Sequence, residues 1–278
     1  MVEDRRAFAC SAPGASHIKQ GRPSQDYALS YEEEGLRIVA VADGHGSAPH
    51  FRSDRGARFA CVCALKRIKD LASAVPPCDG MDAALAGLEL DIVMDWNEAV
   101  IEDWNQGPPD SGEIISEEMM EGVFNPPVAY GTTLIAAALI LPGSAGGGRW
   151  FGIQIGDGRC VVLDTEGGAA QPVPWDEDCC FNATTSLCDL DAAERFRHFY
   201  SPEGAPLPAA LFLGTDGVDN SYPVYENEKH LSGLYQRIYD NFIAEGFAAG
   251  KKQLEEFLPR FSEKGSRDDV SIGGIISL

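Results

Sequence analysis

The sequence lacks any long apolar run and has few basic side chains. No stretch approaches the roughly 18 apolar residues that a membrane-spanning helix needs, and residues 1–15 hold no apolar segment typical of a signal peptide. Only 22 Lys and Arg stand against 43 Asp and Glu in 278 residues, a formal net charge of −21. Because nucleic acids and anionic lipids are bound by basic patches, we expect no nucleic-acid partner and no membrane partner. The sequence predicts a cytoplasmic protein.

Cysteine pairs with the spacing of metal or redox sites are also missing. None of the eight cysteines belongs to a C-x-x-C pair. Cys61 and Cys63 fall in a predicted helix, where residues two apart point in different directions. The adjacent Cys179 and Cys180 lie among acidic residues, which disfavour a thiolate. We therefore interpret all eight cysteines as reduced thiols.

Apolar patterning predicts strands that alternate with pairs of helices. The expected strands are 6–11, 26–32, 36–42, 131–141, 149–156, 159–164, 211–214 and 270–278, and the expected helices are 51–71, 81–104, 224–246 and 248–261. Strands joined by hairpin-type loops favour antiparallel sheets over βαβ units. We expect an α+β fold, a four-layer α-β-β-α sandwich in which two mainly antiparallel sheets pack face to face with helix pairs outside.

Two irregular segments interrupt this pattern within a single predicted domain, 1–278, whose length permits one large core. An acidic surface excursion is expected near 108–128. A polar, proline-containing segment near 175–208 is expected to form a flap-like insertion. Loops of this length are often found beside functional sites, so we expect the insertion to lie close to one.

Aspartates gather at the ends of the predicted strands. Those that end a strand are Asp43, Asp157 and Asp216, and those that begin one are Asp26, Asp268 and Asp269. If the last strand is antiparallel to its neighbours, they meet on one edge of the sandwich. Gathered carboxylates repel one another and need cations, and oxygen ligands favour hard ions such as Mg²⁺ or Mn²⁺. Any single one would more often be an ordinary turn residue, but the set indicates a metal site.

Five motifs, in order along the chain, resemble those of the metal-dependent (type 2C, PPM) protein serine/threonine phosphatase family, in a divergent, prokaryotic-type branch. They are Asp43-Gly44-His45-Gly46, Gly131-Thr132-Thr133, Gly156-Asp157-Gly158-Arg159, Thr215-Asp216-Gly217 and Arg267-Asp268-Asp269-Val270-Ser271. With Gln25 as the start of the matched region, they span nearly the whole chain. One such motif would be weak evidence for the resemblance, whereas five motifs in the family's order are strong evidence for it.

The resemblance implies two divalent cations, Mn²⁺ or Mg²⁺, and a water between them that attacks phosphoserine or phosphothreonine in a phosphorylated protein, the product of a serine/threonine kinase. Asp43 is implied to bridge both cations, with the Gly44 carbonyl on one of them. Asp216 and Asp268 are implied to hold the other. Asp157 matches the ligand of a possible, weaker third cation. The implied activity is hydrolysis of phosphate monoesters.

His45 is the implied general acid that protonates the leaving oxygen. It is the histidine that sits in a Gly-rich turn after a buried strand. The other histidines are interpreted as non-catalytic: His17, His50, His198 and His230.

The chain departs from the family pattern around Gln25, where a glutamate is usual. Glutamine keeps a carbonyl oxygen for the metal, directly or through water, but removes one negative charge; the next residue, Asp26, could join the site. The family arginine four residues earlier is replaced by Gly21, so Arg22 is the predicted phosphate-binding residue.

The sequence leaves three questions open: the phosphate-binding residue, the third cation and the function. Lys19 or Arg52 could bind phosphate in place of Arg22. Asn220 stands where a second acid often follows Asp216, which weakens the case for a third cation. In function, the alternatives are a catalytically weak or inactive phosphatase-like regulatory or phosphoprotein-binding module, and a nuclease or phosphodiesterase, which the acidic charge disfavours.

Overall fold

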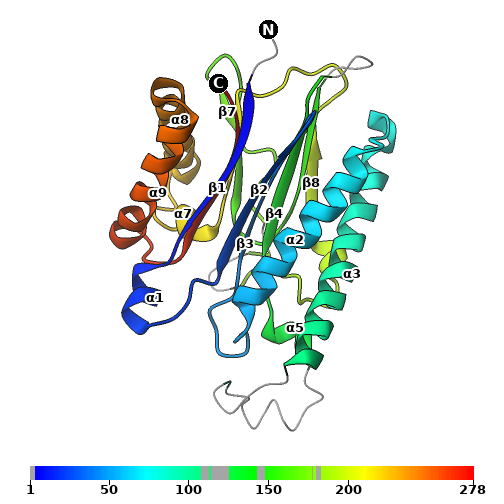
Figure 1. Ribbon diagram of the computed structural model, residues 1–278, viewed down its shortest axis with the longest axis vertical. Helices are drawn as coiled ribbons and strands as arrows, with labels where there is room; N and C mark the ends of the chain where they lie inside the picture. Colours follow the sequence, from blue (N-terminus) through cyan, green and yellow to red (C-terminus); the bar gives the residue numbers. More distant parts are fainter. Residues whose placement is uncertain (1–3, 108–112, 114–124, 143–147, 177, 180–182) are drawn as a thin grey trace.

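Two antiparallel sheets stacked face to face form the centre of the protein (Figure 1). The computed structural model describes residues 4–107, 113, 125–142, 148–176, 178–179 and 183–278. In these residues the first sheet has the order β1 (Arg5–Ala12), β10 (Val270–Ser277), β9 (Ala210–Gly214), β6 (Arg159–Leu163) and β7 (Ala169–Ala170). The second has the order β2 (Asp26–Glu33), β3 (Leu36–Asp43), β4 (Leu134–Ile140), β5 (Arg149–Ile155) and β8 (Arg197–Tyr200).

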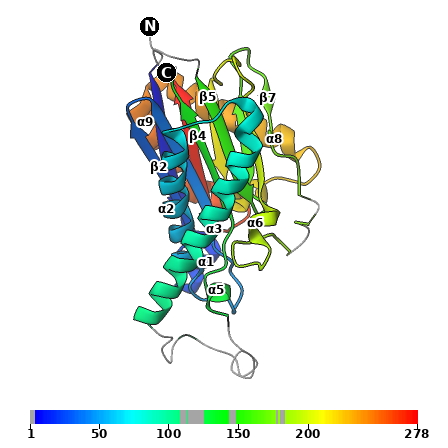
Figure 2. The same cartoon turned by 90° about the vertical axis from the view of Figure 1, so that its right-hand side faces the viewer.

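A pair of long helices covers the outer face of each sheet, as Figures 1 and 2 show. Helices α2 (Ser53–Ala72) and α3 (Met81–Gln106) pack on the second sheet, and α8 (Asn227–Glu245) and α9 (Phe247–Lys264) on the first. The short elements are α1 (Ala15–Gln20), η1 (Cys78–Gly80), α5 (Pro126–Ala129), α6 (Ala192–Arg195) and α7 (Asp216–Asp219). The predicted four-layer α-β-β-α sandwich is confirmed.

The central strands are buried on both faces, which explains their unbroken apolar sequence. Successive side chains of a strand point to opposite sides of the sheet. In β3, Ile38 and Ala40 therefore pack against the helix pair, whereas Val39 and Val41 meet the other sheet. Each strand thus links two of the three apolar layers and fixes the sheets to the helices.

The long strands and helices lie where the sequence predicts them, and the short elements do not appear in the prediction. Strand β8 forms inside the segment 175–208, where no periodicity signalled it, and pairs with β5 at the sheet edge. Most of the predicted excursion, 108–112 and 114–124, lies outside the described residues. Seven cysteines of the described part are free thiols, as expected.

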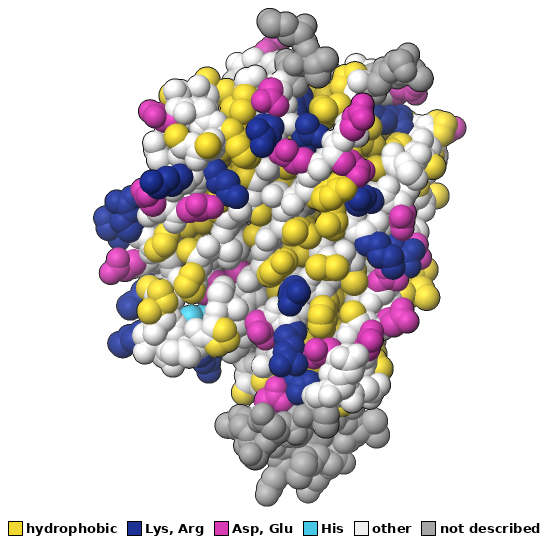
Figure 3. Space-filling view, viewed as in Figure 1, with side chains coloured by type: hydrophobic (Ala, Val, Ile, Leu, Met, Phe, Trp, Pro, Cys, Tyr) yellow, Lys and Arg dark blue, Asp and Glu magenta, His cyan; other side chains and the backbone are white. Residues whose placement is uncertain are grey.

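Charged side chains of both signs are interspersed on the face seen in Figure 3. Among the helices that the structure describes, none is long and apolar enough to cross a bilayer.

Gly56 is required where α2 passes the segment before β4. A Cβ added there would lie 1.8 Å from the carbonyl oxygen of Tyr130. We predict that Gly56→Ala lowers the free energy of unfolding by about 2 kcal/mol or more, because the backbone must shift. Gly87→Ala, in α3 with open space around it, is the matched control and should raise stability by roughly 0.5–1 kcal/mol. Urea unfolding of both variants measures this, and equal effects would contradict the close-approach argument.

Candidate metal centre

A cavity of about 640 Å³ opens at the end of the sandwich where β3, β5 and β9 finish and β10 begins. It lies at the end where β1 leads into α1, opposite the chain termini in Figure 1. Seven of the sequence-predicted site residues line it: Gln25, Asp43, Gly44, His45, Asp157, Asp216 and Asp268. Asp26 lies beside the cavity as the cross-strand partner of Asp43. The antiparallel pairing of β9 with β10 brings the last acidic pair to the same edge.

The two threonines of the Gly-Thr-Thr motif hold the backbone of Asp43. The amide of Asp43 donates to Thr133 Oγ1 at 3.1 Å. Its carbonyl accepts from Thr132 Oγ1 at 2.9 Å and from the amide of Thr133 at 2.9 Å. These bonds fix the point at which the Asp43 side chain enters the cavity, so the motif positions the carboxylate.

Gly44 continues this turn in a space that admits no side chain. A Cβ there would lie 2.7 Å from the carbonyl oxygens of both Gln25 and Ser53. The amide of Gly44 donates to the Gln25 carbonyl at 3.1 Å. The backbone therefore runs close along the cavity wall, where a carbonyl oxygen can serve as a ligand.

Burial and mutual repulsion raise the pKa values of the gathered carboxyl groups. The pKa of Asp43 lies well above its ordinary value because of burial and then of the nearby Asp216. Burial, with the charge of Asp157 nearby, raises the pKa of Asp216 to about 6. The pKa of Asp157 is raised by burial as well, and that of Asp26 by burial and the neighbouring Asp269. The cavity therefore favours bound protons or bound cations over free carboxylates.

Several oxygen atoms of the site have no hydrogen-bond partner among the described residues. They are Gln25 Oε1, Asp26 Oδ1 and Asp216 Oδ1, all buried. Such atoms are normally paired, and their oxygen chemistry suits hard divalent cations. In the same part of the chain, no three His, Cys, Asp or Glu side chains already stand at metal-ligand spacing. The residues fit divalent cations, and binding them requires the repelling carboxylates to draw together.

His45 faces a serine of the insertion across this cavity. His45 Nε2 lies 2.7 Å from Ser186 Oγ. Ser186 Oγ also lies 3.1 Å from the Thr132 carbonyl oxygen, which can only accept. When the hydroxyl proton is used there, His45 Nε2–H is the donor to Ser186. Burial and then the nearby His50 lower the pKa of His45 to about 4. The free cavity thus holds a neutral imidazole in a fixed orientation.

The insertion forms a wall of the cavity next to Ser186. The amide of Leu187 donates to the Thr132 carbonyl at 3.0 Å. The amide of Gly156 donates to Thr185 Oγ1 at 2.9 Å. These bonds tie residues 185–187 to two of the motifs, and sequence reasoning gave no signal for Ser186 itself.

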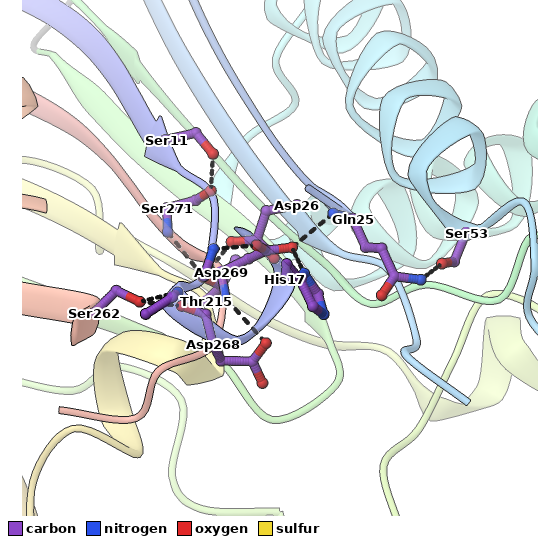
Figure 4. A network of polar contacts seen from close by, with 12 residues as sticks. Ser11, His17, Gln25, Asp26, Ser53, Thr215, Ser262, Asp268, Asp269 and Ser271 are labelled. Carbon is purple, nitrogen blue, oxygen red and sulfur yellow. Dashed lines mark hydrogen bonds and ion pairs between the residues drawn. The ribbon is translucent and has the colours of Figure 1, made fainter. Parts of the chain in front are cut away.

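Asp269 organises the other wall, as Figure 4 shows. Its carboxylate accepts from the amide of Gly14 at 2.5 Å and from the amide of Gln25 at 2.6 Å. His17 Nδ1 lies 2.9 Å from its Oδ2, in a short contact that is not a linear hydrogen bond. Asp269 belongs to the closing motif of the sequence, and its role in holding the loop before β2 has no local sequence signal.

The candidate phosphate-binding residues occupy different places. Arg22 lines a neighbouring pocket of about 310 Å³ that shares Gln25 with the main cavity. Arg52 is already engaged, with an ion pair to Glu113 at 2.6 Å and a hydrogen bond to Tyr130 at 2.8 Å. Lys19 is exposed on α1. Among these three, Arg22 is the one whose pocket adjoins the cavity.

Asp219 and Asn220, near the expected third site, do not add a free carboxylate to the cavity. Asp219 forms a buried ion pair with Arg159 at 3.4 Å. Asn220 lines the cavity and donates from Nδ2 to Asp216 Oδ2 at 2.8 Å. Asp157 thus lacks a second free acid from this turn.

The four-layer sandwich, with carboxylates gathered at its strand ends, was compared with known protein families and solved structures. The family described as Protein phosphatase 2C matches residues 13–259. The chain belongs to this family. No curated protein sequence matches it.

Solved structures with the same fold include bacterial phosphatases. A bacterial serine phosphatase has a TM-score of 0.57 and 13% identity, covering 99% of this chain and 98% of that chain. Serine/threonine phosphatase PstP/Ppp of Mycobacterium tuberculosis has a TM-score of 0.54 and 14% identity, with 100% of both chains covered. Serine/threonine phosphatase Stp1 from Staphylococcus aureus has a TM-score of 0.56 and 13% identity, covering 100% of this chain and 96% of that chain. Identities this low show the fold alone.

The raised carboxyl pKa values predict how pH changes the stability of the metal-free protein. Because the pKa of Asp216 rises to about 6 in the folded state, its contribution to stability is present at low pH and is lost as pH rises through about 6. The melting temperature without metal should therefore fall as the pH rises from about 4 to about 6.5, between the ordinary pKa of the carboxyl group and its raised value. Added Mn²⁺ should raise it more at the higher pH, where protons compete less. Calorimetry with and without EDTA measures this; an equal Mn²⁺ effect at both pH values would contradict it.

Proposed function

We propose that this protein is a metal-dependent phosphatase that hydrolyses phosphoserine and phosphothreonine in phosphorylated proteins. The observation that carries the proposal is the convergence of strand-end carboxylates with raised pKa values in one cavity. Asp43, the Gly44 carbonyl, Asp216 and Asp268 would hold two divalent cations, Mn²⁺ or Mg²⁺. The family match supports this assignment.

Cations held there would acidify a bound water and offset the negative charge of the phosphoryl oxygens. Gln25 and Asp26 would support the site, and Asp157 would hold a weaker third cation. The orphaned Gln25 Oε1 supports a role for the glutamine. Its amide nitrogen donates to Ser53 Oγ at 2.5 Å and to the His45 carbonyl at 3.0 Å, which leaves the oxygen free for a water or a cation.

His45 is proposed to protonate the leaving oxygen. An imidazole with a pKa of about 4 is neutral near pH 7, so the acid role depends on the arriving substrate. A phosphate dianion beside the ring favours the imidazolium form and raises this pKa. The hydrogen bond to Ser186 keeps the ring in place while the substrate enters.

Arg22 is proposed to bind the phosphate or a group next to it. Its pocket joins the cavity through residues shared by both walls, Gln25, Gly46, Ser47 and His50. A guanidinium group can bind two phosphate oxygens at once.

Replacement of one proposed ligand tests the function. We predict Mn²⁺-dependent hydrolysis of p-nitrophenyl phosphate that EDTA abolishes and added Mn²⁺ restores. Asp216→Asn should reduce turnover at least about 100-fold, since even residues behind the ligands are worth 10–100-fold. Asp240→Asn, on the exposed side of α8, is the matched control and should keep full activity.

Activity that survives thorough chelation would contradict the proposal. Binding of Mn²⁺ and of a phosphopeptide without hydrolysis would instead identify a phosphoprotein-binding module. A preference for bis-p-nitrophenyl phosphate would identify a phosphodiesterase.

The acid role of His45 predicts a dependence on the leaving group. His45→Ala should slow hydrolysis of a phosphothreonine peptide about 10²–10⁴-fold, because an alkoxide needs a proton to leave. Hydrolysis of p-nitrophenyl phosphate should change far less, since nitrophenolate leaves unprotonated. His230→Ala, exposed on α8, should affect neither substrate. Steady-state kinetics on both substrates decides, and equal slowing would refute the acid role.

A further inference from the structure

We propose that His17 is a ligand of the cation that Asp216 and Asp268 would hold, bound through Nε2 and oriented by Asp269. This inference rests on the proposed metal centre and adds a nitrogen ligand to a set otherwise made of oxygen. The sequence alone indicates no catalytic role for His17. The structure lines the cavity with His17, Asp43, Asp216 and Asp268 together.

Helix α1, which carries His17, lies against the segment that holds Asp268 and Asp269. Gly14, directly before α1, packs against the backbone of the closing acidic pair: a Cβ there would lie 2.5 Å from the Asp268 carbonyl carbon and 2.7 Å from the Asp269 nitrogen. The amide of Ser16 donates to the Arg267 carbonyl at 2.9 Å. His17 follows in the first turn of α1 and is therefore held next to Asp268.

The His17 ring lies against the carboxylate of Asp269. His17 Nδ1 lies 2.9 Å from Asp269 Oδ2, and the two side chains are only 11% and 3% exposed. The amides of Gly14 and Gln25 already bind the two oxygens of this carboxylate. Asp269 lines the cavity, but both of its oxygens are committed to these hydrogen bonds, so it serves as a support for the ring.

The position of the proton on the His17 imidazole decides which ring nitrogen can bind a cation. A carboxylate beside Nδ1 favours the tautomer with the proton on Nδ1, which leaves a lone pair on Nε2. In a cavity lined by carboxylates, this lone pair adds to the negative potential and is stabilised by a cation. Histidines that bind metals usually donate their other ring N–H to a carboxylate. In Figure 4 the Asp269 carboxylate lies beside His17 Nδ1 as an ion-pair contact without hydrogen-bond geometry.

A nitrogen ligand also fits the departure at Gln25. The glutamine removes one negative charge from the site, and a neutral imidazole adds a ligand without adding charge. Mg²⁺ prefers oxygen, whereas transition-metal ions accept imidazole readily. We therefore expect the site to favour Mn²⁺ over Mg²⁺ more strongly than carboxylates alone would.

Pulsed EPR on the full-length chain loaded with Mn²⁺ tests this directly. Electron spin-echo modulation should show ¹⁴N coupled to Mn²⁺, and growth with ¹⁵N-histidine should replace it with a ¹⁵N signal. His17→Gln should abolish the coupling. It should also weaken Mn²⁺ binding, measured by calorimetry, about tenfold or more, and reduce the ratio of the Mn²⁺ affinity to the Mg²⁺ affinity. His50→Gln, which changes another histidine of the same cavity, should keep the coupling.

A variant that fails to fold does not block the test. If His17→Gln is unfolded by circular dichroism, the coupling is measured in the double variant His45→Gln, His50→Gln. These two residues are the other histidines that line the cavity in the described part of the chain. Coupling that persists in the double variant assigns it to His17, and its loss there overturns the inference.

The outcomes separate this inference from the proposed function. Mn²⁺ bound without nitrogen coupling, in a protein that hydrolyses p-nitrophenyl phosphate, overturns the ligand role and leaves the phosphatase intact. Nitrogen coupling from His17 in a protein that hydrolyses nothing supports the ligand role and overturns the phosphatase. Coupling that persists in His17→Gln overturns the ligand role.

Discussion

Electrostatic repulsion among carboxyl groups buried in one cavity is the constraint on which the rest of the site depends. Asp43, Asp157 and Asp216 are brought together by strand ends, half-buried in the cavity wall, where the surrounding protein weakens the screening of their charges by water. The surrounding residues are arranged to hold them there: threonines fix the Asp43 backbone, and amide groups satisfy Asp269. The cavity is consequently stable when its charge is balanced by protons or by cations. The cation-bound state is the one that would support catalysis.

The long elements of the fold could be predicted because each has its own local pattern. Strand β3 reads as a continuous apolar run since helices cover one face and the other sheet covers the second. The helices α2, α3, α8 and α9 show apolar residues at helical spacing. Strand β8 carries little such signal: it is four residues long, and its place at the sheet edge is set by pairing with β5 rather than by its own sequence.

The candidate site could be predicted as far as its motifs are contiguous in sequence. Each of the strand-end aspartates is followed or preceded by a short turn, so the acids could be found one motif at a time. The contacts that position these motifs join distant segments and leave no local pattern. Ser186 is 141 residues from the histidine that it contacts, and Asp269 binds an amide 255 residues away.

Through the hydrogen bond between Ser186 and His45, the insertion controls the orientation of the imidazole. Residues 185–187 are tied to the cavity by their own backbone and side chains, yet they belong to a segment whose sequence is not dictated by the strands. A small molecule that pulled Ser186 outward would release the imidazole without competing for the cations.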